Sequence, residues 1–150
     1  MHVDSSADRR VALMSIHPHY AEAIVSGRKR AEFRKRPLAA DVDVVLIYAT
    51  APISAIVGWF TVKDTIQTTP ENIWRLLHDV GEIQWTDFAA YYSGCTEAVA
   101  LLVGRAERLK KPVALSEIDP NPATPQSFNY LPGRVMTQLV VELELEDVPA

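Results

Sequence analysis

The sequence predicts an α+β domain, a small mixed β-barrel of five to six strands with short flanking helices. Three observations lead to this fold class. Apolar and β-branched runs recur along the 150 residues, two segments between them carry helix start and stop signals, and one proline-rich stretch interrupts the pattern near the end. With 48% apolar and 23% charged residues, the chain is long enough for one core and short for two, so we expect a single domain.

The first part of the chain predicts a strand, a short helix and a hairpin. Residues 11–16 are a short apolar run that predicts a strand. The helix that follows has Pro18 in its first turn and Gly27 as its left-handed C-cap. Residues 42–50 are nearly continuous in apolar and β-branched side chains, which predicts a central strand that pairs with residues 55–64.

The middle of the chain predicts two helices and a long strand. Thr69 at the N-cap and Pro70 at the first helical position begin a helix whose apolar residues keep helical spacing to residue 80. Residues 86–94 predict a shorter helix that stops at a glycine. Residues 97–109 then predict a long apolar strand.

The end of the chain predicts a loop and one further strand. Residues 119–133 are rich in proline, which excludes a helix or a central strand and predicts a loop. Apolar and acidic side chains alternate over residues 136–146, as in a strand with one buried face. We therefore expect residues 1–10 to be a disordered leader and residues 11–150 to form the domain.

The cysteine content and the hydropathy pattern indicate in which compartment the protein resides and which cofactors it can bind. Cys95 is the only cysteine, and no Cys or His cluster has the spacing of a zinc site, so we expect no metal and no other cofactor. The N-terminus lacks the apolar core of a secretory signal, and no apolar run is long enough to span a bilayer. We expect a cytoplasmic protein without a membrane partner; the sequence leaves the oligomeric state open.

Residues 26–36 concentrate positive charge in an acidic chain. Six lysines and arginines surround Glu32, so the segment carries +5, against −9 for the rest of a chain whose net charge is −4. A basic patch on an acidic body indicates a specific anionic partner. Because residues 30–34 alternate as in a half-buried strand, we expect Glu32 to lie between Arg30 and Arg34 on one face.

Two interpretations of this basic segment stay open. In the first, it is a solvated edge strand whose charges prevent edge-to-edge pairing. In the second, Glu32 accepts a hydrogen bond from the amino group of cytosine or adenine. Lys29, at the turn before the strand, then reaches a phosphate or, after losing its proton, acts as a nucleophile or base.

A second candidate surface lies in the proline-rich loop. The loop places Gln126, Ser127 and Asn129 beside two aromatic residues, Phe128 and Tyr130. Rigid loops with aromatic and amide groups suit base stacking and the reading of base edges. The alternative is that the loop only packs over the core.

Three segments of the sequence together resemble one known family. They read LMSIHPHYAEAIVSGRKRAEFRKR, VVLIYATAPISAIVGWF and PQSFNY, and their most specific element is a glycine-x-lysine-x-x-glutamate-x-arginine pattern, formed by Gly27, Lys29, Glu32 and Arg34. Over residues 11–130 the chain resembles the ASCH domain (activating signal cointegrator homology) of the PUA-like superfamily. The resemblance implies a PUA-like β-barrel with a cleft lined by this pattern, and relatives that bind RNA or read modified bases in DNA.

On this resemblance we expect a module that binds RNA or DNA and accommodates one nucleobase, a modified base included, in the cleft. The basic side chains attract phosphates, Glu32 and Arg34 read polar base edges, and Phe128 or Tyr130 stacks on the base. The residues expected to bind nucleic acid are Ser15, His17, Arg28, Lys29, Arg30, Glu32, Arg34, Lys35, Arg36, Tyr48, Thr50, Gln126, Ser127, Phe128, Asn129 and Tyr130.

Two other function classes stay open. Some ASCH proteins are small hydrolases, either amidohydrolases acting on an acylated cytidine or ribonucleases. If this chain is a metal-independent hydrolase, the resemblance implies Lys29 and Glu32 as its catalytic residues. The amidohydrolases have a threonine where Glu32 stands and recruit a further glutamate, for which Glu82 is the candidate. The third class is an interaction domain whose cleft binds a peptide or a small anion.

Overall fold

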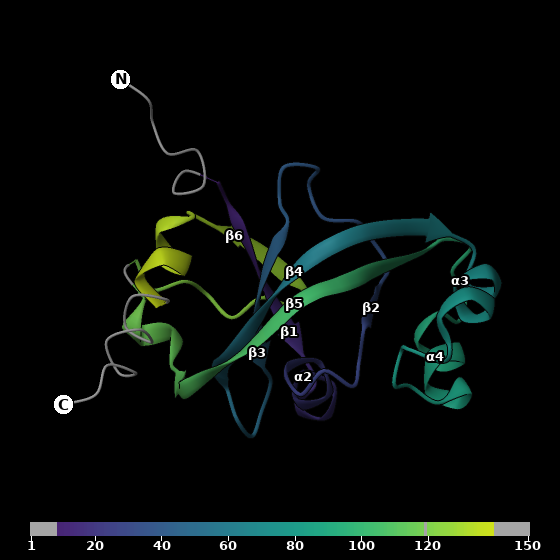
Figure 1. Ribbon diagram of the computed structural model, residues 1–150, viewed down its shortest axis with the longest axis horizontal. Helices are drawn as coiled ribbons and strands as arrows, with labels where there is room; N and C mark the ends of the chain where they lie inside the picture. The colour runs from purple at the N-terminus through teal and green to yellow at the C-terminus, as the bar shows by residue number, and fades with distance from the viewer. Residues whose placement is uncertain (1–8, 119, 140–150) are drawn as a thin grey trace.

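The computed structural model describes residues 9–118 and 120–139. Six strands form one mixed sheet in the order β2-β5-β4-β3-β1-β6, and short helices flank it, so the α+β class and the strand number are confirmed. The helices α3 (Pro70–Leu77) and α4 (Trp85–Tyr91) lie at one end of the molecule, and a helix that includes residues 134–139 lies at the other (Figure 1).

The centre of the sheet follows the prediction for the first part of the chain. Strand β1 (Val11–Ile16) runs parallel to β3 (Val44–Ala49), and the connection between them contains α2 (Pro18–Val25). Strand β3 pairs with β4 (Ala55–Thr68) in an antiparallel arrangement, which confirms the predicted hairpin. On its other side, β1 pairs with the edge strand β6 (Phe128–Leu131).

The two longest strands carry the helical pair and the basic segment. Strand β5 (Ala98–Val113) runs antiparallel to β4, and α3 and α4 are inserted between the far ends of these strands (Figure 1). Strand β2 (Ala31–Arg34), from the basic segment, pairs only with β5 and forms the other edge of the sheet. The first interpretation is correct in that β2 is an edge strand, but it is wrong in calling this strand solvated, because Ala31, Glu32 and Phe33 are buried.

The helix signals in the sequence have the physical roles predicted for them. The Thr69 hydroxyl accepts a hydrogen bond from the Asn72 amide at 3.2 Å, and Pro70 occupies the first turn of α3. Gly27 follows α2 with φ of +86°, a conformation that favours glycine at a helix end. This turn leads the chain directly from α2 to β2.

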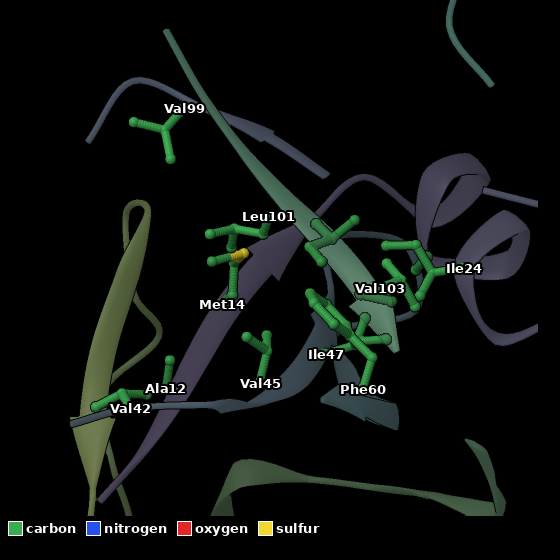
Figure 2. Close-up of a cluster of buried hydrophobic side chains, with 13 residues drawn as sticks. Ala12, Met14, Ile24, Val42, Val45, Ile47, Phe60, Val99, Leu101 and Val103 are labelled. Carbon is green, nitrogen blue, oxygen red and sulfur yellow. The ribbon is translucent and has the colours of Figure 1, made fainter. Parts of the chain in front are cut away.

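Apolar side chains cover both faces of the central strands. Alternate residues of β1, Ala12, Met14 and Ile16, join Phe60 in one buried cluster (Figure 2). The residues between them, Val11 and Leu13, join a second cluster on the opposite face. Burial on both faces explains why these strands read as continuous apolar runs. A third cluster packs β2 against α3 and α4.

The end of the chain differs from the prediction in two ways. Residues 128–131, expected in a loop, form the edge strand β6, which tolerates nearby prolines because it pairs on one side only. Residues 134–139 are helical rather than part of a strand over 136–146. Val135 and Leu139 are buried four residues apart, the spacing of one helix face, and they pack against the second cluster. Residues 140–146 lie outside the described residues.

Two further expectations concern the N-terminus and the membrane. Residues 1–8 of the expected leader lie outside the described residues, while Arg9 pairs with Asp43 and Arg10 with Asp41. Among the helices of the described residues, none combines the length and the apolar character that crossing a bilayer would require.

Candidate functional site

A cleft of about 780 Å³ opens beside strand β2, where this strand meets the start of α2 and the helix α4. Charged, aromatic and small apolar side chains share its lining. The residues that line the cleft are Ile16, His17, His19, Tyr20, Lys29, Glu32, Phe33, Arg34, Ile83, Asp87, Ala90 and Tyr91. Three members of the glycine-lysine-glutamate-arginine pattern therefore meet in one cleft.

Lys29 is the most deeply buried charged residue of this cleft, with 1% of its surface exposed. Its Nζ donates a hydrogen bond to the Gly81 carbonyl at 2.5 Å and lies 3.9 Å from Glu32 Oε1. The ammonium also sits over the rings of Tyr20 and Phe33, at 5.0 and 4.7 Å from their centroids. These contacts hold the amine at the wall of the cleft.

Burial lowers the pKa of Lys29 below the ordinary lysine value of 10.5. The carboxylates of Glu32 and Glu82 act in the opposite direction, since negative charge favours the ammonium form, but the effect of burial is larger. More of this amine is therefore neutral near physiological pH than of an exposed lysine. A neutral amine can accept a proton or attack an electrophile.

Arg34 forms hydrogen bonds that link the two edges of the sheet. Its Nη1 lies 3.2 Å from Glu32 Oε2 and donates a longer hydrogen bond, at 3.4 Å, to the Ser15 carbonyl of β1. Its Nη2 donates to Ser127 Oγ at 2.5 Å. Strands β2 and β6 are opposite edges of the sheet, so this guanidinium joins β2 to β1 and to the segment that leads into β6. The side-chain Nε of Arg34 is buried without a hydrogen-bond partner among the described residues.

The helical pair is fastened to the same segment. The Tyr92 hydroxyl donates to the Arg34 carbonyl at 2.8 Å and lies 3.3 Å from the Val99 carbonyl, and the Arg30 amide donates to the Val80 carbonyl at 2.8 Å. Burial raises the pKa of Tyr92, so its phenol stays protonated and keeps its donor. The α3–α4 region therefore holds β2 in its orientation and also forms one wall of the cleft.

One of the two cations predicted to flank Glu32 is wrong. The alternation in the sequence placed Glu32 between Arg30 and Arg34, whereas its partners are Arg34 and Lys29. Arg30 precedes β2, is exposed and lines a separate small hollow beside Val103. The reason is the turn after α2, which directs the Lys29 side chain inward before the strand begins.

The predicted site residues divide into three groups. Lys29, Glu32, Arg34 and His17 line the main cleft. A smaller adjacent cleft of about 280 Å³ is lined by Arg34, Lys35, Arg36, Tyr91, Gln126 and Ser127. The remaining predicted residues do not line the main cleft: Ser15, Arg28, Arg30, Tyr48, Thr50, Phe128, Asn129 and Tyr130.

The aromatic residues predicted to stack on a base occupy other positions. Phe128 and Tyr130 pack against the first apolar cluster and do not line the main cleft. The prediction that they stack on a base in this cleft is therefore wrong. Tyr130 Oη also accepts the Ala39 amide at 2.8 Å. Tyr48 is buried in the second cluster. The alternative interpretation, in which this segment packs over the core, describes these two side chains.

Several polar residues predicted for the site serve the fold. Ser15 Oγ donates to the Pro125 carbonyl at 2.7 Å, which ties β1 to the proline-rich segment. The Thr50 amide donates to the Ile16 carbonyl at 3.1 Å. Asn129 is exposed, and its side-chain amide donates to the Ala123 carbonyl at 3.4 Å.

Eight of the twelve residues that line the main cleft were not among the predicted site residues, and three of these, Tyr20, Asp87 and Tyr91, carry polar groups on helical elements. Tyr20 follows His17 by three residues, so helical spacing alone places both on one side of α2. Tyr91 and Asp87, four residues apart on α4, likewise share one side of a predicted helix. No signal in the sequence indicated that this side of α4 faces β2.

Within residues 9–118 and 120–139, no group of three or more His, Cys, Asp or Glu side chains is arranged to hold a metal ion.

Comparison with known proteins agrees with this architecture. The ASCH domain matches residues 14–107. An ASCH domain-containing ribonuclease of Zymomonas mobilis is 33% identical over 140 residues, covering 91% of this chain and 93% of that protein.

Solved structures give the same result at the level of the fold. The crystal structure of ASCH from Zymomonas mobilis superimposes with a TM-score of 0.79 at 32% identity, covering 91% of this chain and 96% of that one. A mutant of that protein with a serine replaced by alanine has a TM-score of 0.80 at 30% identity, covering 91% and 98%. The fold is therefore PUA-like, and this chain belongs to the ASCH domain family.

Proposed function

We propose that the protein binds single-stranded RNA, holds one nucleotide in the main cleft and cleaves the strand there. The observation that carries the proposal is the buried Lys29 amine, with its lowered pKa, beside the Arg34–Glu32 ion pair in an open cleft. A catalytic base and a fixed positive charge are two of the groups that assist cleavage of a phosphodiester by the neighbouring 2′-hydroxyl. The relative named as a ribonuclease, which matches over nearly its whole length, supports RNA as the substrate.

The chemistry assigns a role to each side chain. Neutral Lys29 accepts the proton of a ribose 2′-hydroxyl as its oxygen attacks the adjacent phosphorus. The bond from phosphorus to the 5′-oxygen breaks, which leaves a 2′,3′-cyclic phosphate and a 5′-hydroxyl end. Arg34 stabilises the negative charge that develops on the phosphoryl oxygens. Glu32 keeps Arg34 in place through the contact at 3.2 Å.

His17 supplies the proton that the leaving oxygen requires. The acid is the imidazolium form of His17, which becomes the neutral ring when it gives up its Nε2 proton; in that neutral ring Nδ1 accepts the His19 amide at 3.3 Å. The side chain is exposed and lines the cleft, where Nε2 can donate to a substrate oxygen. Lys29 as base and His17 as acid form a pair that needs no metal ion.

A second candidate function is recognition of a nucleobase without cleavage, a modified base included. The observation that favours it is the pairing of carboxylates, Glu32 and Asp87, with the rings of Tyr20 and Tyr91 in one cleft. Carboxylates accept hydrogen bonds from base amino groups, and tyrosine rings stack on bases. In this function Lys29 contacts the ligand as a cation and is not a base.

Cleavage of end-labelled RNA tests the two functions against each other. The substrates are a single-stranded RNA, the same strand with 2′-deoxyribose at each position, its duplex, and an acylated cytidine for the amidohydrolase alternative. We expect cleavage of the single-stranded RNA alone, with cyclic phosphate ends and unchanged in EDTA. Lys29→Met lowers the rate by roughly 10²- to 10⁴-fold while RNA still binds.

The matched control is Lys63→Met, which removes an exposed lysine from β4. Lys63 lines neither cleft, so we expect that the loss of its amine leaves the cleavage rate at the wild-type value. Base-dependent binding by a wild-type protein that cleaves none of the substrates would replace the ribonuclease proposal with the recognition function.

A further inference from the structure

The smaller cleft adjoins the main cleft and shares two of its residues. Arg34 and Tyr91 line both, so they form the boundary between the two spaces. The other side chains of the smaller cleft come from the residues after β2, Lys35 and Arg36, and from the segment before β6, Gln126 and Ser127. The smaller cleft thus lies at the seam where the two edges of the sheet meet.

The two clefts differ in charge. In the main cleft the cations Lys29 and Arg34 stand beside the carboxylates of Glu32 and Asp87. The lining of the smaller cleft contains three cations, Arg34, Lys35 and Arg36, and no acidic side chain. The smaller cleft therefore favours an anion more strongly than the main cleft does, and the mixed charges of the main cleft also suit a polar base.

Ser127 lines the smaller cleft and has a hydroxyl that can donate a hydrogen bond there. Its Oγ accepts the short hydrogen bond from Arg34 Nη2, so the hydroxyl hydrogen is available for another acceptor. The contacts of Arg34 with Glu32 and the Ser15 carbonyl fix its guanidinium, so that it also orients Ser127. Serine and glutamine side chains, with lysine and arginine, are common donors to phosphate oxygens.

The walls of the smaller cleft are held in place by the fold. The carbonyl of Pro125, just before Gln126, accepts Ser15 Oγ at 2.7 Å, which fastens this segment to β1. On the opposite side, Lys35 Nζ lies 4.8 Å from the centroid of the Tyr91 ring. Ser127 and Lys35 therefore have contacts that orient them before an anion binds, which reduces the conformational entropy that these two side chains lose on binding.

We propose that the smaller cleft is a phosphate subsite, which binds the backbone phosphate next to the nucleotide held in the main cleft. This inference rests on the proposed function and extends it: the substrate class is an oligonucleotide that carries a phosphate beyond the cleft, rather than a nucleoside. Lys35, Arg36 and the Ser127 hydroxyl make the phosphate contacts, and Arg34 orients Ser127.

Titration of the full-length protein with inorganic phosphate, followed by NMR of the backbone amides, tests the subsite directly. We expect saturable shifts at residues 35, 36, 126 and 127, and smaller ones at Tyr20 and Lys29. Arg36→Ala should weaken phosphate binding about tenfold, the loss of one charge-assisted contact. The control Lys63→Ala should leave binding at the wild-type value. Equal weakening by both variants, or shifts spread over all basic residues, would overturn the subsite.

Kinetics with RNA separates failure of the subsite from failure of the proposed function. If wild type cleaves RNA and Arg36→Ala raises KM with little change in kcat, the subsite is supported. If wild type cleaves RNA and neither Arg36→Ala nor Ser127→Ala changes KM, the subsite is wrong and the proposed function stands. If phosphate binds as expected but RNA is neither bound nor cleaved, the proposed function fails, and with it the assignment of this anion site to RNA.

Discussion

The apolar interior of the sheet and the wall of the main cleft both contain side chains with almost no exposed surface. Those of the interior are apolar, whereas those of the cleft wall are charged. In the interior, Met14, Ile47 and Phe60 have no exposed surface and carry no charge (Figure 2). In the cleft wall, Lys29 is 1% exposed and Glu32 is 5% exposed. The first region lowers the free energy of the fold by removing apolar surface from water. The second removes charges from water, which costs free energy unless each charge is paired.

This difference is consistent with the function proposed for the cleft. Replacing a buried ion pair by apolar side chains of similar volume is often neutral or stabilising, so stability alone does not explain Lys29, Glu32 and Arg34. The hydrogen bonds that Lys29 and Arg34 donate to Gly81, Ser15 and Ser127 reduce the free-energy cost of burying these charges. The charges are nevertheless removed from water. A ligand in the cleft is the simplest reason to keep these charges.

The largest expected effect is in the interior. Phe60→Ala should lower the free energy of unfolding by about 3 to 5 kcal/mol, because the lost ring leaves a cavity among side chains from several strands. Urea unfolding of the variant measures the loss. Phe60→Leu keeps most of the volume and should lose less. A loss below about 1 kcal/mol for the alanine variant would contradict the rigid interior described here.

The next effect is in the cleft wall. Arg34→Met should lower the free energy of unfolding by about 3 kcal/mol, because the carboxylate of Glu32 stays buried without its nearest cation. The double variant Arg34→Met with Glu32→Gln removes both charges and should recover most of this loss. Thermal or urea unfolding compares the three proteins. A double variant no more stable than the single one would mean that Arg34 acts mainly by joining the sheet edges.

The pH dependence of stability isolates Lys29. Its native pKa is lowered by burial, so between that pKa and 10.5 the unfolded chain binds a proton that the native protein does not. Stability relative to Lys29→Met should therefore rise with pH in this window, with a slope of up to about 1.4 kcal/mol per pH unit. Below the window the difference between the two proteins should be constant. Curves that stay parallel up to 10.5 would show that the native pKa is not lowered.

The smallest effect is at an exposed ion pair. Glu22 and Arg108 are in contact at 2.6 Å, but both side chains are about half exposed. The hydrogen bond from Arg108 lowers the pKa of Glu22, so its contribution is present above the ordinary carboxyl pKa and is lost as pH falls through the lower native value. Glu22→Gln should cost about 0 to 1 kcal/mol at neutral pH, less at high salt. A cost comparable to that of Arg34→Met would remove the contrast between buried and exposed pairs.

The strands and helices could largely be predicted because their signals are local. Continuous apolar runs indicated β1 and β3, and the Thr69 cap with Pro70 placed the start of α3 at the residue where the structure has it. Two exceptions lie near the end of the chain: residues 128–131 form a strand where a loop was predicted, and residues 134–139 are helical, although an alternating pattern from residue 136 indicated a strand. Val135 and Leu139 favour a helix through contacts with distant strands, and a local pattern does not contain those contacts.

The sequence by itself determined the family and most of the strand pattern, and it grouped Lys29, Glu32 and Arg34 in one recognisable pattern. Only the tertiary structure decided which of these charges are buried and what they contact. Lys29 is desolvated beside the Gly81 carbonyl, 52 residues away, and Arg34 meets Ser127 across 93 residues. Desolvation and pairing depend on which distant segments come together, so the chemistry of this cleft follows from these tertiary contacts rather than from any local run of residues.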